Sequence, residues 1–352
     1  MPSFLHAADL HLGAPFTNYR KDFQEALQRY QRQCLLFLID QAIEKNVDAI
    51  LFAGDFFDNP KPSKGLIDFV LRALEPLEAM GIPFVLALGN HDAGLVGELF
   101  EDSPLKILSP LKAEILNFDG WTLAGISYKQ EWDLRRVVDV LPCKTSGLYV
   151  GLVHSALGEE VYMPLAAGDI EKLAYDYLAL GHVHNFSNVA NPRKVFYSGA
   201  LSQLGSDRAG FLYVNLAEDG PVWIPSPSFP IKNHILELKD IRRDLEKVSS
   251  FKEDLIELTL KGELDEKDQL YLDHWKKNNT EFHVKDNTVT KKVFLKTPLY
   301  QGSEKILKNN PELLFSNTEL LGWTHSEALD YIRHHEEDLL IELKDLFRGI
   351  YD

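Results

Sequence analysis

Residues 4–11 read Phe-Leu-His-Ala-Ala-Asp-Leu-His, a short apolar run that ends in Asp9 and His11. Four later segments repeat this pattern of a short apolar run followed directly by polar side chains. Continuous apolar runs of this length are typical of strands buried on both faces of a sheet. The four segments are Ala49–Ala53 before Gly54-Asp55-Phe56-Phe57-Asp58, Phe84–Leu88 before Gly89-Asn90-His91-Asp92, Leu148–Val153 before His154, and Tyr177–Leu180 before Gly181-His182-Val183-His184.

Helical patterns alternate with these runs. Residues 22–45 and 66–80 carry apolar side chains at helical spacing, and they separate the first three predicted strands. Strands that alternate with helices predict an α/β fold with a largely parallel sheet. Because ligands bind outside the carboxyl ends of the strands in such folds, polar groups at the ends of five runs predict one shared site.

The side chains at these strand ends are compatible with divalent metal ions. They offer carboxylate, amide and imidazole donors and no thiolate, which favours Mn²⁺, Fe or Zn²⁺ over a soft metal or Ca²⁺. Seven donors exceed what one such ion uses, so two ions sharing a bridging carboxylate is the economical arrangement. A single histidine could instead satisfy a core hydrogen bond, but that interpretation does not account for five groups in register. The candidate ligands are Asp9, His11, Asp55, Asn90, His154, His182 and His184.

In this order, the five groups resemble the signature blocks of calcineurin-like metallophosphoesterases, over about residues 3–215. The resemblance implies an α/β fold, a four-layer αββα sandwich. It also implies a phosphoester hydrolase that holds two divalent cations, with Mn²⁺ the expected metal and Fe or Zn²⁺ possible. The implied ligands are Asp9, His11 and His184 for the first ion and Asn90, His154 and His182 for the second, with Asp55 bridging.

Two further residues are candidates for catalysis. His91 directly follows the candidate ligand Asn90 and faces the same pocket, and the resemblance implies that it contacts the phosphate or protonates the leaving oxygen. Asp58 is placed to orient His91 or tune its pKa, although a carboxylate that caps a helix is an equally simple interpretation. His6, three residues before Asp9, is either a residue that supports the site or a core histidine.

Individual residues within the signature blocks distinguish between subfamilies. Protein phosphatases of this superfamily have Arg where Asn59 follows Asp58, and purple acid phosphatases have a Tyr ligand in place of Asp58. His6–Gly13, the Asp55 block and Phe196–Ala200 are similar to SbcD-type DNA repair nucleases, most of all to their YhaO-like branch. The resemblance implies a Mn²⁺-dependent DNA exonuclease or endonuclease, an SbcC-type coiled-coil ATPase partner and a homodimer.

Basic residues near the candidate ligands are predicted to contact substrate phosphates. Arg20 lies in the loop after the first strand, and Lys61 and Lys64 lie in the loop after the second. The alternative is that all three are solvated surface charges.

We predict three parts in the chain. Residues 1–228 form the catalytic domain, 229–300 a small α+β cap domain, and 301–352 a C-terminal helical segment. The first boundary rests on the proline-rich stretch 221–230, which is typical of an extended connector. The apolar stripe of the predicted helix 326–349 either packs on its own chain or docks onto the ATPase partner.

Composition limits the possible partners. The 352 residues carry 37 Lys and Arg against 53 Asp and Glu, a net charge of −16, which is the opposite of a general nucleic-acid-binding surface. This charge favours the rival hypothesis, a small-molecule phosphodiesterase or phosphatase using the same site. A scaffold with a vestigial site is the third hypothesis. With two cysteines, no basic leader and no long apolar stretch, we expect a cytoplasmic protein without a membrane segment.

Overall fold

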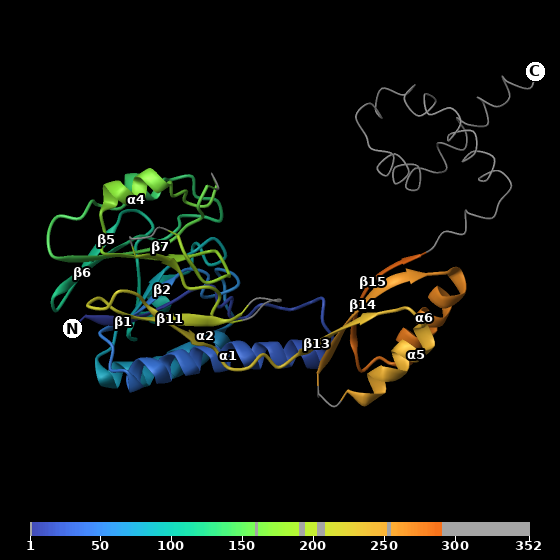
Figure 1. Ribbon diagram of the computed structural model, residues 1–352. Helices are drawn as coiled ribbons and strands as arrows, with labels where there is room; N and C mark the ends of the chain where they lie inside the picture. Colours follow the sequence, from blue (N-terminus) through green and yellow to red (C-terminus); the bar gives the residue numbers. More distant parts are fainter. Residues whose placement is uncertain (1, 159–160, 190–193, 203–207, 252–254, 291–352) are drawn as a thin grey trace, which may run out of the picture. The chain divides into compact units, whose positions relative to one another are not determined.

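The computed structural model describes residues 2–158, 161–189, 194–202, 208–251 and 255–290 (Figure 1). By their contacts, they fall into two compact units. The first comprises Met1–His234 with Lys252–Leu258 and Glu281–Val284, and the second comprises Ile235–Phe251 and Thr259–Thr280 and continues from Lys285. The predicted C-terminal segment, residues 301–352, lies outside the described residues.

The first sheet has six strands in the order β12-β11-β1-β2-β3-β4. Strands β1 to β4 are parallel, and β11 and β12 are antiparallel to their neighbours. The carboxyl ends of β1, β2 and β3 therefore meet at one edge. The bounds are β1 Ser3–Ala7, β2 Ala49–Ala53, β3 Phe84–Ala87, β4 Leu105–Ile107, β11 Gly210–Asn215 and β12 Val222–Pro225.

The second sheet also has six strands, in the order β5-β6-β7-β8-β10-β9. Strands β6, β7, β8 and β10 are parallel, and the two outer strands are antiparallel to them. The bounds are β5 Glu114–Phe118, β6 Trp121–Gly125, β7 Leu148–His154, β8 Tyr177–Gly181, β9 Ser187–Asn188 and β10 Val195–Tyr197.

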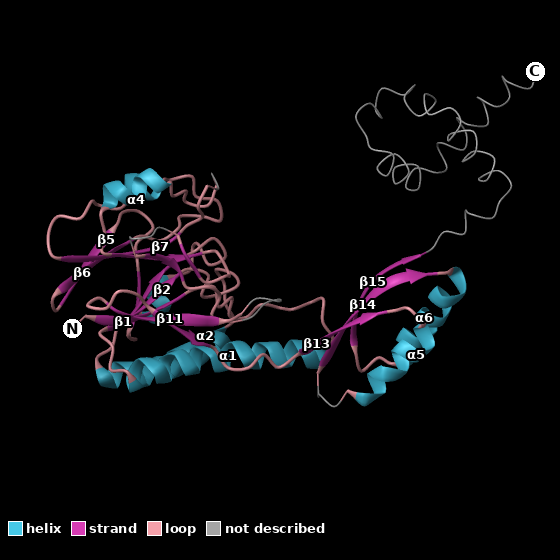
Figure 2. Ribbon diagram, in the orientation of Figure 1, coloured by secondary structure: helices cyan, strands magenta, loops and turns pink. Residues whose placement is uncertain are grey.

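Helices cover the outer face of each sheet (Figure 2). Helices α1 (Lys21–Glu44) and α2 (Lys64–Met80) pack on the first sheet, where Tyr30 and Leu74 share a buried cluster with Phe52. The short helices α3 (Val137–Val140) and α4 (Ala167–Leu173) pack on the second sheet. A 3₁₀ turn, Gly97–Phe100, precedes β4.

A separate core fills the space between the two sheets. Phe4 and Leu51 of the first sheet lie in one buried cluster with Trp121, Leu152 and Tyr177 of the second. Because the central strands have apolar neighbours on both faces, their sequences are continuous apolar runs. The layers are therefore helix, sheet, sheet and helix, which confirms the predicted four-layer αββα sandwich.

The elements that decide the fold match the sequence prediction to within about two residues at each end. The connector is the exception, because Val222–Pro225 within it forms β12 at the edge of the first sheet. Prolines are tolerated there because an edge strand has one side without partner carbonyls. The predicted extended connector therefore contains a short edge strand.

A third, smaller sheet and two helices lie in residues 232–251 and 255–290, and the cap-domain bounds 229–300 stay a prediction. The three strands lie in the order β13-β14-β15, and Asp240 and Asp265 cap the helices by accepting backbone N–H groups. The bounds are β13 Lys232–Glu237, α5 Ile241–Glu246, a 3₁₀ turn Lys247–Ser250, β14 Ile256–Leu264, α6 Glu266–Asn278 and β15 His283–Thr290. Among the described residues, no helix is long and apolar enough to cross a bilayer.

The two sheets approach each other closely at Gly181, the last residue of β8. A Cβ atom there would overlap the carbonyl oxygen of Ala53 at the end of β2. We expect Gly181→Ala to lower the free energy of unfolding by about 3 kcal/mol, because backbone atoms of two packed sheets cannot move apart cheaply. Urea denaturation of the purified variant measures this.

The matched control is Gly65→Ala, because Gly65 lies in α2 and a Cβ atom added there would have no neighbouring atom within 4 Å. That change removes backbone freedom from the unfolded chain, so stability should stay level or rise by up to about 1 kcal/mol. Equal stability of the two variants would contradict the proposed close approach.

Candidate metal centre

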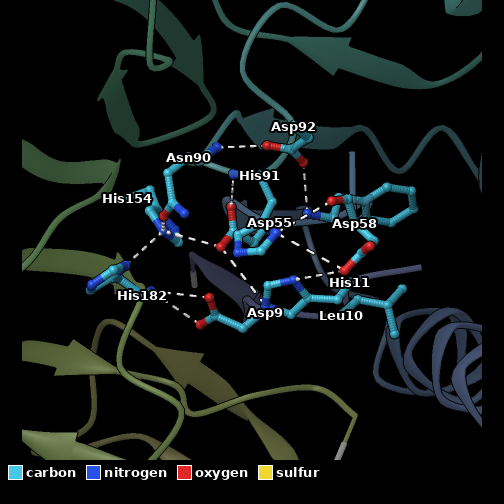
Figure 3. Close-up of polar contacts among 12 residues, drawn as sticks. Asp9, Leu10, His11, Asp55, Asp58, Asn90, His91, Asp92, His154 and His182 are labelled. Atoms are coloured by element: carbon cyan, nitrogen blue, oxygen red, sulfur yellow. Dashed lines mark hydrogen bonds and ion pairs between the residues drawn. The ribbon is translucent and has the colours of Figure 1, made fainter. Parts of the chain in front are cut away.

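The seven predicted ligands come together where the parallel strands of both sheets end, and Figure 3 shows all of them except His184. Asp9 and His11 follow β1, Asp55 follows β2, and Asn90 follows β3, all from the first sheet. His154 is the last residue of β7, and His182 and His184 follow β8, all from the second sheet. The site therefore exists only where the two sheets face each other.

The backbone is strained at four of these positions. Asp9, His11 and Asp55 have φ values of 53°, 49° and 53°, and His182 has 100°. Non-glycine residues in this region cost on the order of 1–3 kcal/mol each and persist only where the surroundings hold them. Here hydrogen bonds between the two loops help, since the N–H groups of Asp9 and His11 donate to the carbonyls of Gly54 and Asp55.

His154 presents a lone pair to the pocket. Its Nδ1 lies 2.8 Å from the carbonyl oxygen of Ala53, which can only accept, so Nδ1 carries the proton and Nε2 is an acceptor. Yet Nε2 lies 3.0 Å from Oδ1 of Asn90 and 3.3 Å from Nδ1 of His182. An imidazole nitrogen and an amide oxygen that face each other with their lone pairs form a donor set for a divalent cation.

His11 also presents an imidazole nitrogen that is available to a metal ion. Its side chain is buried, and its Nε2 atom has no hydrogen-bond partner. That atom lies 3.8 Å from Oδ2 of Asp55. Burial lowers the pKa of His11 to about 3, so the ring is neutral and its nitrogen lone pair is available to a cation.

Asp55 lies at the centre of the group. Its Oδ1 accepts the backbone N–H of His91 at 2.9 Å, and its Oδ2 lies 3.5 Å from Nε2 of His154. Burial alone would raise the pKa of Asp55, but the nearby imidazoles of His154 and His11 lower it overall. A buried carboxylate with ligand nitrogens on two sides has the position that a bridging ligand needs.

Asp9 and His184 complete the set. Asp9, His11 and His184 can each bring one ligand atom to within 4.8 Å of the others, and so can Asp9, Asp55 and His154. The carboxylate of Asp9 also accepts the backbone N–H of His182 at 3.1 Å. Burial and the charge of Asp55 raise the pKa of Asp9, and a cation beside these carboxylates would offset that repulsion.

His91 reaches the pocket from its open side. Its side chain is 44% exposed, and Nδ1 lies 3.3 Å from the backbone carbonyl oxygen of Asp58, which therefore orients the ring. The carboxylate of Asp58 lies 4.0 Å from His91 and 3.8 Å from His11. Burial raises the pKa of Asp58. The hydrogen-bond partner of His91 is thus the main-chain carbonyl of Asp58, and the carboxylate of Asp58 lies beyond hydrogen-bond distance.

The three predicted phosphate contacts lie on loops. Arg20 precedes α1 and forms an ion pair with Asp22 at 2.5 Å. Lys61 is exposed in the loop after Asp58, and Lys64 is the exposed first residue of α2. Their role in substrate binding stays a prediction.

Asp92 is a functional residue to which sequence reasoning gave no role. It is fully buried, and its carboxylate accepts the backbone N–H groups of Phe56, Phe57 and Gly89 at 2.7, 3.2 and 2.7 Å. It ties the loop after β2 to the loop after β3 and so fixes Asp55 beside Asn90. Its place in the Gly89-Asn90-His91-Asp92 block was the available signal.

Two tyrosines lie at the site that no sequence pattern predicted. The ring of Tyr162 lies 4.7 Å from the ring of His182, and that of Tyr128 lies 5.4 Å from the ring of His154. Both come from irregular segments, so no periodic pattern marks them. They restrict the orientations that the two imidazoles can adopt.

His6 joins the two sheets beneath the site. Its Nε2 lies 3.1 Å from the carbonyl oxygen of Leu180, so Nε2 carries the proton and Nδ1 accepts from the Tyr177 hydroxyl at 2.9 Å. His6 belongs to β1 and both partners belong to β8. Of the two interpretations of His6, the structure therefore favours the core histidine, which links strand β1 to strand β8.

His6 makes stability depend on pH. Burial lowers the pKa of His6 to about 3, whereas an unfolded chain has a value of about 6.5. Between about pH 6 and pH 4 the unfolded chain binds a proton that the folded chain does not, so this residue's contribution falls by about 1.4 kcal/mol per pH unit. We expect the stability advantage of wild type over His6→Gln to shrink accordingly as the pH falls, as measured by urea denaturation.

Tyr177→Phe is the control, because it removes a hydrogen-bond partner but keeps the titrating ring. It should be less stable than wild type by a nearly constant amount across the same pH range. If the difference in the free energy of unfolding between wild type and His6→Gln does not change with pH, His6 is not a neutral, buried residue.

Comparison with known proteins agrees with this geometry. The family model described as calcineurin-like phosphoesterase matches residues 2–186. The protein belongs to this family. The ligand clusters at the strand ends fit the two metal ions that the family implies.

Curated relatives are more distant. The chain is 30% identical over 199 residues to the uncharacterized metallophosphoesterase YhaO of Bacillus subtilis, covering 52% of this chain and 48% of that protein. It is 27% identical over 250 residues to the DNA double-strand break repair protein Mre11 of Aeropyrum pernix, covering 63% and 60%. The matches thus span about half to three fifths of these relatives.

A solved structure, a dimetal phosphatase from Danio rerio, aligns with a TM-score of 0.40 at 10% identity, covering 60% of this chain and 91% of that one.

Proposed function

We propose that the protein is a Mn²⁺-dependent phosphodiesterase that cuts DNA, as an exonuclease or endonuclease in DNA repair. The observation that carries the chemistry is the convergence of imidazole nitrogens, an amide oxygen and buried carboxylates at the ends of strands from two sheets, at His154, His11, Asn90, Asp9 and Asp55. The similarity to a DNA repair protein and the SbcD-like details of the sequence support DNA as the substrate.

The proposed ligands divide between two cations. Asp9, His11 and His184 would hold one, and Asn90, His154 and His182 the other, with Asp55 shared, as the distances within each group allow. When bound, two such ions supply Lewis-acid stabilisation of a phosphate and ease deprotonation of a water. Two divalent charges also supply the local positive charge that a chain of net charge −16 needs to approach a phosphodiester.

The chain's own residues would then place and protonate the substrate. Asp55, held by the N–H of His91, keeps the ligands of the two ions at a fixed separation. His91, exposed at the mouth of the pocket, can donate a proton to the leaving oxygen or a hydrogen bond to the phosphate. The carboxylate of Asp58 lies 4.0 Å from Nδ1 of His91, at the edge of the same pocket.

Hydrolysis assays test this proposal. We expect the protein with Mn²⁺ to cleave labelled single- or double-stranded DNA, and Asp55→Ala and His91→Ala to lower kcat by about 10² or more. Loss of the bridging carboxylate should also abolish cleavage of bis-p-nitrophenyl phosphate. Asp119→Ala is the matched control, because Asp119 is exposed in the turn before β6, at the opposite end of that strand from the site.

The outcome also decides between substrate classes. Cleavage of the small ester but not of DNA would support the alternative, a small-molecule phosphodiesterase or phosphatase, which the acidic net charge favours. Activity that survives in both Asp55→Ala and His91→Ala would refute the site itself.

Partner, assembly and location belong to the same proposal. An SbcC-type coiled-coil ATPase would bind the predicted helix 326–349 within the C-terminal segment 301–352, and a homodimer would form through the catalytic domain in the cytoplasm. Co-purification of the ATPase with the full chain, and not with a chain truncated before Thr324, would support this docking. A truncated chain that still binds the ATPase would refute it.

A further inference from the structure

Gln31 is a polar residue on the buried face of α1. Its neighbours one turn away on that face, Leu27 and Leu35, are buried apolar residues, and Gln31 itself is fully buried. A buried amide is costly unless its hydrogen bonds are made, so its partners explain its place there.

All of these partners belong to the loop that presents Asp9 and His11. Nε2 of Gln31 donates to the carbonyl oxygens of Leu10 and His11, at 3.0 and 2.6 Å, and Oε1 accepts the N–H of Gly13 at 3.3 Å. One side chain thus binds three backbone groups of the segment that immediately surrounds two candidate ligands.

The loop needs such support because its backbone is strained. Asp9 and His11 both have positive φ values, which non-glycine residues adopt at a cost. The N–H groups of Asp9 and His11 are held by the loop after β2. Gln31 holds the carbonyl groups on the other side, so the strained segment is fixed between a helix and a neighbouring loop.

We propose that Gln31 is a positioning residue of the metal centre, which holds the loop from Asp9 to Gly13 so that Asp9 and His11 bind one of the two cations. This inference rests on the proposed dimetal function. We expect the larger effect at the ion that Asp9 and His11 bind, because the bonds of Gln31 go only to the loop after β1, whereas Asn90, His154 and His182 come from other strands.

The variant that tests this is Gln31→Met, which keeps the side-chain length and removes the amide. The fold should survive, because the Leu10 carbonyl still accepts from the Ser202 hydroxyl at 2.9 Å and the His11 carbonyl still accepts the N–H of Ala14 at 3.0 Å. Calorimetric titration of the metal-free full chain with Mn²⁺ measures both binding steps directly, without relying on activity.

We expect wild type to bind two Mn²⁺ ions, and Gln31→Met to bind one of them about 10–100-fold more weakly, with a smaller loss at the other step. Leu38→Ala is the matched control, since Leu38 is buried on the same helix in the apolar core. It should lower stability and leave both steps unchanged.

The other outcomes separate failure of this inference from failure of the proposed metal centre. If wild type binds two ions and Gln31→Met binds both as tightly, the inference is wrong and the proposed function stands. An equal loss in Leu38→Ala would mean that lower stability alone weakens binding, which also overturns it. If wild type binds no Mn²⁺, the proposed metal centre itself fails.

Ser202→Ala provides a second test should Gln31→Met not fold. It removes one of the two side-chain hydrogen bonds to the Leu10 carbonyl. If Ser202→Ala binds the same Mn²⁺ ion several-fold more weakly, hydrogen bonds that hold this loop contribute to metal binding. An unchanged Mn²⁺ affinity would overturn the inference.

Discussion

The site depends on the close approach of two parallel-stranded sheets at their carboxyl ends. Strand β8 meets β2 where Gly181 leaves no room for a side chain beside Ala53. Four hydrogen-bonded residue pairs, made by three side chains, tie the sheets together near this point. They are His6 with Leu180 and Tyr177, the ring of His154 with the carbonyl of Ala53, and the carboxylate of Asp9 with the N–H of His182.

Burial determines the protonation state of the histidines at the site. Imidazoles such as His11 and His182 are kept neutral, with pKa values lowered to about 3 and about 4, because burial disfavours the charged ring. Neutral rings offer lone pairs, and the carboxylates of Asp9 and Asp55 lie among them. The same low-polarity surroundings that make unpaired carboxylates costly strengthen their attraction for a divalent cation.

Support for the ligands comes from residues that do not themselves face the pocket. Asp92 joins the loops after β2 and β3, and Gln31 holds the loop after β1 against helix α1. Both are fully buried polar side chains whose hydrogen bonds go to backbone groups. Such residues allow Asp9, His11 and Asp55 to keep strained backbone conformations that present their side chains to one point.

The sequence by itself determined the layered α/β fold and the strands that carry the site, because buried parallel strands are apolar runs and parallel strands end at one edge. It marked Asp55 and His154 by their place after such runs. It did not mark Gln31 or Tyr162, because their roles depend on which backbone or ring they meet. Only the tertiary structure decided that His91 bonds to the main chain of Asp58, since hydrogen-bond partners distant in sequence are set by packing rather than by local pattern.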